Sequence, residues 1–342
     1  MDTLKGNKRI DSVDILRAVG ILIMVMGHVG FGGVFDRYIH SFHMPIFFLI
    51  SGFLFVPKKE VGVGLQILKR AGRLLIPYVF YAIINYLFWI LLIYDKEWYV
   101  PLLNAVTYNT QGLPISGALW FLTAMFFAEA YYMILDRVIK NEIVRSALVI
   151  FVSVVASFLQ NITSFRLPLT IDTAVVCMGF LELGRILKHI DQSTWMSKIK
   201  QRKILVFILA VVLLCVNVVL SFVNEYVNIK SGWYGFVPLF WINALIGSAA
   251  YLTLAIWFDS VAAESNIIRR ILVVIGRRSM IFLGLNQLVI LLLSVAYSVL
   301  RLPYNFYISG VIIFAATAVV LYLLCLLIGI IKIKPIKKLF GI

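Results

Sequence analysis

Long apolar runs follow one another along the 342-residue sequence, separated by short polar segments. Runs of this length and composition are typical of membrane spans. We predict spans at residues 15–34, 42–56, 74–94, 118–135, 146–160, 173–187, 204–224, 236–258, 279–300 and 307–331. The pattern therefore predicts an all-α integral membrane protein with about ten transmembrane helices. We expect a single domain over residues 1–342, with a helical core at about 13–331 and no separate soluble domain.

The composition supports this class. Hydrophobic residues make up 62% of the chain and charged residues only 14%, and the mean hydropathy is +0.98. About a quarter of the residues are charged in an average soluble protein. The composition therefore excludes a soluble protein.

The net charge of +15 would suit nucleic-acid binding, but its distribution indicates membrane topology instead. If residue 1 is cytoplasmic and the sides alternate, only a few basic residues fall outside: Arg37, Lys96, Arg166, Lys230 and Arg301. The positive-inside rule predicts this asymmetry. We expect both termini in the cytoplasm, a multi-pass position in the cell (plasma or inner) membrane, the lipid bilayer as a partner and no nucleic-acid partner.

The first predicted helix contains the stretch "DILRAVGILIMVMGHVG", in which Arg17 and His28 are ionisable. An Arg or Asp side chain costs roughly 2.5–3.5 kcal/mol at the membrane centre on insertion scales. Eleven residues span almost three helical turns, so Arg17 and His28 share one face about 16 Å apart. Asp14, one turn before Arg17, can pair with it. A snorkelling anchor would explain Arg17, whereas a buried neutral imidazole at His28 is a competent general base.

The stretch "YIHSFHMPIFFLISGFLF" places His43 at the outer start of the second predicted helix. Because a short connection at 35–41 makes the first two helices antiparallel, His28 and His43 are expected to lie close together. His40 and His43 are three residues apart, as some metal ligands are, but no cysteine or obvious third ligand accompanies them. We therefore expect no metal.

Two further groups of charges stand at helix positions. In "LKRAGRLLIPY", Arg70 and Arg73 lie one turn apart at the inner entrance of the third span. Such a pair can bind phosphates bidentately, although positive-inside anchoring explains it equally well. In "GALWFLTAMFFAEAYY", Glu129 lies near mid-membrane, where a carboxylate is a functional candidate by default.

Two predicted outer loops, 95–117 and 225–235, are rich in Trp, Tyr and Asn with Gly or Pro turns. These residues suit carbohydrate stacking and hydrogen bonding. An interfacial aromatic belt has the same composition, so both interpretations stay open.

Several motifs in order resemble the membrane-bound acyltransferase-3 family: "RIDSVDILRAVGILIMVMGH", "SFHMPIFFLISGFLF", "KRAGRLLIPY" and "GALWFLTAMFFAE". The later stretches "LPLTIDTAVVCMGFLELGRILK", "YGFVPLFWINALIGS" and "IGRRSMIFLGLNQL" are most similar to its fucose 4-O-acetylase-like branch. The resemblance implies an O-acyltransferase that moves an acyl group from cytoplasmic acyl-CoA, usually acetyl-CoA, to a carbohydrate acceptor. That acceptor would be a hydroxyl of a cell-surface or exported polysaccharide of the cell envelope.

The resemblance also implies residue roles. Arg17 and His28 would form the essential pair, and Arg70 and Arg73 would bind the acyl-CoA phosphates. His43 and Glu129 fall on motif positions. We expect His28 to act as a base or as an acyl carrier.

Two positions depart from the family's pattern. The chain has Asn286 where relatives often have His, and Asn228 where they often have Asp. Both positions lose an ionisable group, which is consistent with a different acceptor or with impaired activity. Glu129 or Asn286 is the expected partner that orients the His28 imidazole.

Two other functions stay open. A transporter of a glycan precursor or small solute would explain the many helices, but it would not consume acyl-CoA. An inactive relative could serve as a scaffold among glycan-assembly proteins, and it would tolerate His28→Ala. The transporter does not explain why a histidine follows an arginine by three turns together with an arginine pair at the inner end, whereas the inactive relative keeps the fold and is made conceivable by Asn286 and Asn228.

Overall fold

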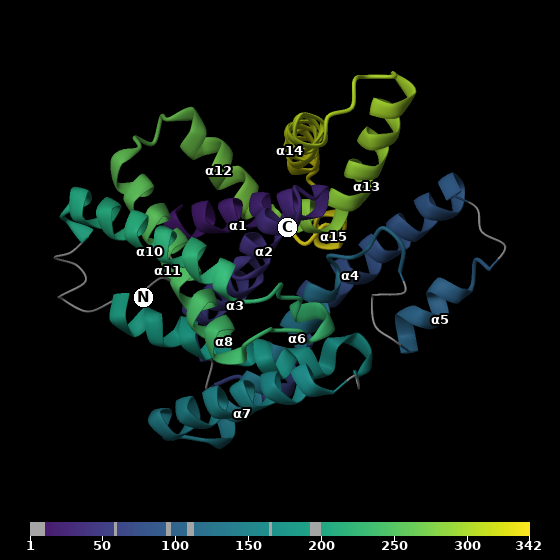
Figure 1. Cartoon of the computed structure of the whole chain (residues 1–342). Helices are drawn as coiled ribbons and strands as arrows, with labels where there is room; N and C mark the ends of the chain where they lie inside the picture. Colours follow the sequence, from purple (N-terminus) through teal and green to yellow (C-terminus); the bar gives the residue numbers. More distant parts are fainter. Residues whose placement is uncertain (1–10, 58–59, 94–96, 108–112, 164–165, 192–199) are drawn as a thin grey trace.

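A computed structural model describes residues 11–57, 60–93, 97–107, 113–163, 166–191 and 200–342, and in this part of the chain the regular elements are helices joined by short loops (Figure 1). Its α-helices are α1 (Asp11–Val29), α2 (Gly33–His40), α3 (His43–Leu54), α4 (Val63–Ile93), α5 (Val100–Thr107), α6 (Trp120–Val138), α7 (Glu142–Ile162), α8 (Ile171–Asp191), α10 (Lys203–Val223), α11 (Val237–Val261), α12 (Ile267–Arg277), α13 (Ser279–Val299), α14 (Phe306–Ile330) and α15 (Lys334–Leu339). Two 3₁₀-helices, η2 (Pro168–Thr170) and η3 (Ile229–Ser231), lie in connections.

Every predicted span overlaps one long or medium helix, so the all-α prediction is confirmed for the described residues. Seven helices there are long and apolar enough to cross a membrane: α1, α4, α7, α10, α11, α13 and α14. The 12-residue α3 is short for a span, and α6 and α8 bury the carboxylates of Glu129 and Glu182. Crossing by α3, α6 and α8 stays a prediction, as does the cytoplasmic position of both termini. Lys5, Lys8 and Arg9, which belong to the predicted inner N-terminal segment, lie outside the described residues.

Two predicted helix ends and one predicted connection are wrong. The first helix ends at Val29 rather than at residue 34, because Gly30 and Gly32 adopt left-handed φ angles of 80° and 98° that a continuing helix excludes. The connection predicted at 35–41 is the helix α2. The third helix begins at Val63 rather than at residue 74, because its basic residues lower the hydropathy of the first turns without interrupting the helix.

Helix α1 lies in the middle of the molecule (Figure 1) and packs against α3, α11, α12, α13 and α14. The helices α3 and α8 approach with their backbones in contact. A Cβ added at Gly52 would collide with the carbonyl of Leu181, and one added at Gly184 would collide with the carbonyl of Leu49. Small residues allow this approach in membranes. The contact fixes α3, which carries His43 and Ser51.

The helix ends define two sides. We call the end at which α1 begins and α3 ends the inner end, because the sequence predicts it to be cytoplasmic. The opposite end, where α1 ends and α3 begins, is the outer end.

Candidate active site

A cavity of about 260 Å³ opens at the outer end between α1, α3, α6 and the loop before α11. We call it the outer cavity. Its lining consists of Met24, Gly27, His28, His40, His43, Met44, Gly117, Ala118, Trp120, Tyr226, Val227, Asn228, Ile229, Lys230 and Gln287. The structure thus brings together the predicted residues His28 and His43 and adds a third imidazole, that of His40.

His28 lies in the last turn of α1 and is hydrogen-bonded to Gln287 of α13, with 3.1 Å between His28 Nδ1 and Gln287 Nε2. The backbone N–H of Gly117 donates to Gln287 Oε1, which turns the amide NH₂ group toward His28. Because an amide nitrogen only donates, Nδ1 of His28 is the acceptor. A neutral His28 therefore carries its proton on Nε2.

This contact corrects an expectation. The partner of the His28 imidazole is Gln287, and neither Glu129 nor Asn286 holds that place. The Asn286 amide instead donates to the carbonyls of Phe282 and Leu283, at 3.0 and 2.8 Å, within its own helix.

In His43 and His40 the donor and acceptor nitrogens are the reverse of those in His28. Nδ1 of His43 lies 2.8 Å from the carbonyl of Ile39, and Nδ1 of His40 lies 2.8 Å from the carbonyl of Asp36. Because a carbonyl only accepts, both Nδ1 atoms carry protons and both Nε2 atoms are acceptors when the rings are neutral. The two rings meet edge to face with centroids 5.0 Å apart. Burial lowers the pKa of His40, which favours its neutral form.

The loop between α10 and α11 forms one wall of the outer cavity. It folds as the helix η3, closed by a bridge between Asn228 and Trp233 and by Gly232, whose φ is 70°. The guanidinium of Arg166 fixes the loop by donating to the carbonyl of Ser231 at 2.8 Å. The loop thereby places Tyr226, Asn228 and Lys230 at the cavity.

The inner half contains a second group, the inner cluster of Ser51, Arg70 and Glu129. Arg70 donates to both carboxylate oxygens of Glu129, and Ser51 donates to one of them. Glu129 is 2% exposed. At 1.5 Å per residue, Ser51 lies about 12 Å along α3 from His43. Glu129, the predicted mid-membrane carboxylate, therefore forms an ion pair with Arg70, one of the two arginines predicted to bind phosphate.

The remaining predicted basic residues lie elsewhere. Arg17 lies on α1 and pairs with Asp14 at 3.3 Å, as expected. Arg73 is exposed on α4, so it does not join Arg70 in the inner cluster. A Cβ at Gly72 would lie 3.7 Å from Nζ of Lys338, so the basic helix α15 packs beside this part of α4.

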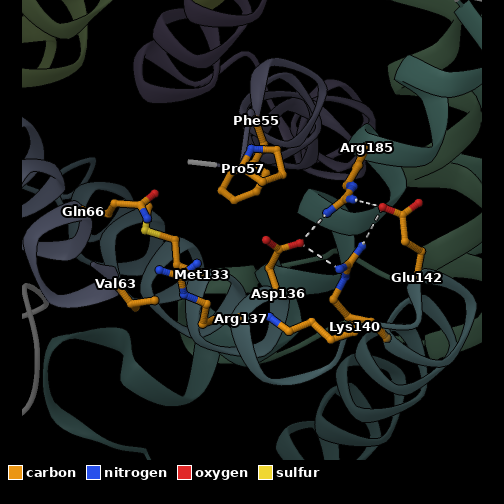
Figure 2. A pocket seen from close by; sticks show the side chains of 11 residues that line it. Phe55, Pro57, Val63, Gln66, Met133, Asp136, Arg137, Lys140, Glu142 and Arg185 are labelled. Carbon is orange, nitrogen blue, oxygen red and sulfur yellow. Dashed lines mark hydrogen bonds and ion pairs between the residues drawn. The ribbon is translucent and has the colours of Figure 1, made fainter. Parts of the chain in front are cut away.

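One turn further inward than the inner cluster is a smaller cavity of about 80 Å³, the inner cavity (Figure 2). Phe55, Gln66 and Met133 line it, each four residues from a member of the inner cluster.

Asp136 accepts from Arg145 at 2.7 Å and from Arg185 at 2.8 Å, and Glu142 pairs with Arg185 at 2.7 Å. These charges compensate one another, which indicates a structural role in joining α6, α7 and α8.

Sequence reasoning missed Gln287 and Lys230 as cavity residues. Gln287 is a polar residue in an apolar helix, directly after the noted Asn286, and that signal could have identified it. From the sequence, Lys230 is predicted only as a basic residue of an outer loop, because its position at the cavity depends on how that loop folds. Among the described residues, no group of three or more His, Cys, Asp or Glu side chains is arranged to hold a metal ion.

A comparison with protein families adds to this geometry. A family model described as an acyltransferase domain matches residues 10–330, which include both cavities and the inner cluster. No curated protein and no solved structure matches the chain.

Proposed function

The chain belongs to the acyltransferase-3 family, and we propose that it transfers an acetyl or other short acyl group from cytoplasmic acyl-CoA to a hydroxyl of a cell-surface or exported glycan. The observation that carries the proposal is the outer cavity, because its three imidazoles supply both proton donors and proton acceptors. We place the protein in the cell membrane, with the glycan reaching the outer cavity, and we assign its sequence to the fucose 4-O-acetylase-like branch.

In the proposed reaction the glycan hydroxyl attacks the thioester carbonyl. A C–O bond forms, the C–S bond breaks, and the hydroxyl proton passes through a base to the departing thiolate of CoA. The step needs a proton acceptor beside the hydroxyl and a donor beside the carbonyl oxygen, on which negative charge develops.

We assign the base to His43 and the donor to His28. His43 can take a proton on Nε2 without losing its bond to the Ile39 carbonyl, because that bond is made by Nδ1–H. His28 cannot be protonated on Nδ1 without losing the bond from Gln287. Its Nε2–H is instead suited to donate to the carbonyl oxygen. Removing one such donor typically lowers turnover about 10²–10³-fold.

The donor's anionic end would bind at the inner end. Arg73, exposed on α4, and Lys338 of α15 supply cations there, and neither forms an ion pair with a carboxylate of the described residues. Arg70 would contribute through the inner cluster, with Glu129 holding its guanidinium, and Arg17 would contribute from α1. The pantetheine arm would cross the roughly 12 Å between the inner cluster and the outer cavity.

The test compares a deletion strain that is complemented with wild type, His28→Ala or the control Arg301→Ala. Base-released acyl groups of the surface polysaccharide are identified by mass spectrometry, and membrane levels of each protein are measured. Wild type and the control are expected to restore an O-acyl group, and His28→Ala is expected to restore at most about 1% of it.

Equal restoration by His28→Ala would show that the histidine is structural. The absence of acyl groups from every strain, together with no consumption of acyl-CoA by the purified protein, would overturn the proposed function and favour a transporter or scaffold.

A further inference from the structure

We propose that the glycan unit accepted by this protein carries an anionic group, a carboxylate or a phosphate, which the ammonium group of Lys230 binds in the outer cavity. The inference rests on the proposed function and names its substrate class. It makes Lys230 a residue that determines specificity.

The charge of the cavity lining is the first argument. Of the described residues that line the outer cavity, Lys230 is the one lysine or arginine, and none is Asp or Glu. The nearby carboxylate of Asp36, which acts on His40 and Tyr226, is not part of the lining and accepts from the backbone N–H of Phe31 at 3.4 Å. A ligand in this cavity therefore contacts a lysine and no carboxylate side chain of the described lining.

The second argument is the state of Lys230 itself. Within the described part of the chain, its Nζ has no hydrogen-bond or ion-pair partner. The side chain is half-buried, and this burial lowers the pKa of Lys230. Partial desolvation of a charge without a partner is unfavourable. An anionic ligand would supply the missing partner, whereas a neutral sugar would not.

The third argument is the position of the lysine. The hydrogen bonds from Arg166 to the loop and the helix η3 fix the backbone at Lys230. Trp120 and Tyr226 line the same cavity and can stack on a sugar ring. A sugar held there would contact the imidazoles of His28 and His43 with its hydroxyl and Lys230 with its anionic substituent.

The experiment uses the full-length protein in nanodiscs, labelled acetyl-CoA and the surface glycan from the organism of origin. One sample of the glycan is untreated, in a second the carboxylates are reduced to neutral alcohols, and in a third the phosphates are removed. The variants are Lys230→Gln, Lys230→Arg and the control Arg301→Gln, which removes an exposed charge outside the cavity.

We expect wild type and Arg301→Gln to acylate the untreated glycan at least about 10-fold more efficiently than one of the two treated samples, as a charged hydrogen bond of 1.5–3 kcal/mol implies. The treatment that lowers transfer identifies the anion. Lys230→Gln should lose this preference while still acylating the neutral sample, and Lys230→Arg should retain most of it.

Equal acylation of all three samples by wild type would overturn the inference and leave the proposed function intact. So would a preference that Lys230→Gln retains. No transfer to any sample and no acyl-CoA consumption would instead overturn the proposed function.

Discussion

Gln287 decides which nitrogen of His28 carries the proton. Its amide oxygen accepts from the backbone of Gly117, so its NH₂ group must face Nδ1 of the imidazole. This arrangement stabilises the neutral imidazole with the proton on Nε2. The chemistry of the predicted catalytic histidine thus depends on a side chain from a distant helix.

The substitution Gln287→Glu tests this dependence. A carboxylate at this position would accept both from Gly117 and from His28 Nδ1–H, which would leave Nε2 without its proton. If His28 serves as a hydrogen-bond donor, turnover should fall about 10²-fold, with little change in the KM for acyl-CoA. The measurement is the kcat and KM for acyl transfer in nanodiscs.

Gln287→Met provides the matched control, because it removes the bond without imposing the opposite proton position. We expect it to lose about 10-fold in turnover, less than Gln287→Glu, since His28 can then adopt either form. A higher turnover of Gln287→Glu than of wild type would show that His28 acts as a base through Nε2.

The sequence predicted residues better than it predicted their partners. His28 and His43 were found because ionisable groups are rare in apolar helices, and both line the outer cavity. The pairing of Arg70 with Glu129 was not foreseen, since it depends on how α4 and α6 rotate against each other. Spacing within one helix does not contain that information.

At the scale of elements, helix existence was predictable and helix ends were less so. Apolar composition marks the membrane-buried middle of a helix, whereas its end depends on backbone conformation and on polar flanks. The left-handed φ at Gly30 ends α1 early, and the basic first turns of α4 extend it inward. The second change places Arg70 inside a helix, where it can reach Glu129.

The crossing of α3 and α8 gives an element-scale prediction. Because a Cβ at Gly52 would collide with the Leu181 carbonyl, Gly52→Ala must separate the two helices. The shift would move Ser51 and His43 together. We expect a lower melting temperature in detergent, a loss of at least about 2 kcal/mol of stability and strongly reduced transfer.

Gly64→Ala on α4 is the control for that experiment. A Cβ there meets no atom within 4 Å, and alanine favours a helix over glycine by about 1 kcal/mol. Its melting temperature should equal or exceed that of wild type. A Gly52→Ala variant as stable and active as Gly64→Ala would contradict the close crossing of α3 and α8.

At the scale of the whole molecule, the number of crossings determines which side each loop occupies. If the chain starts in the cytoplasm and all ten long or medium helices cross, the α13–α14 connection with Arg301 is outside and Lys334 is inside. If only the seven long apolar helices cross, these two positions exchange sides. Lys140 stays inside in both cases, because α3 and α6 enter or leave the count together before it.

This exchange can be measured with single cysteines. The native Cys177, Cys215 and Cys325 are replaced by Ala, and Arg301→Cys, Lys334→Cys or Lys140→Cys is added at an exposed position. Intact cells are treated with a membrane-impermeant maleimide before and after permeabilisation. The excess of basic residues in the predicted inner segments favours ten crossings, so Arg301→Cys should react in intact cells and the other two only after permeabilisation. Reaction of Lys334→Cys but not of Arg301→Cys in intact cells would establish seven crossings. With seven crossings, α3 and α6, which connect the acyl-CoA site to the three imidazoles, would not span the membrane. The acyl group would then have to reach the imidazoles by a different path.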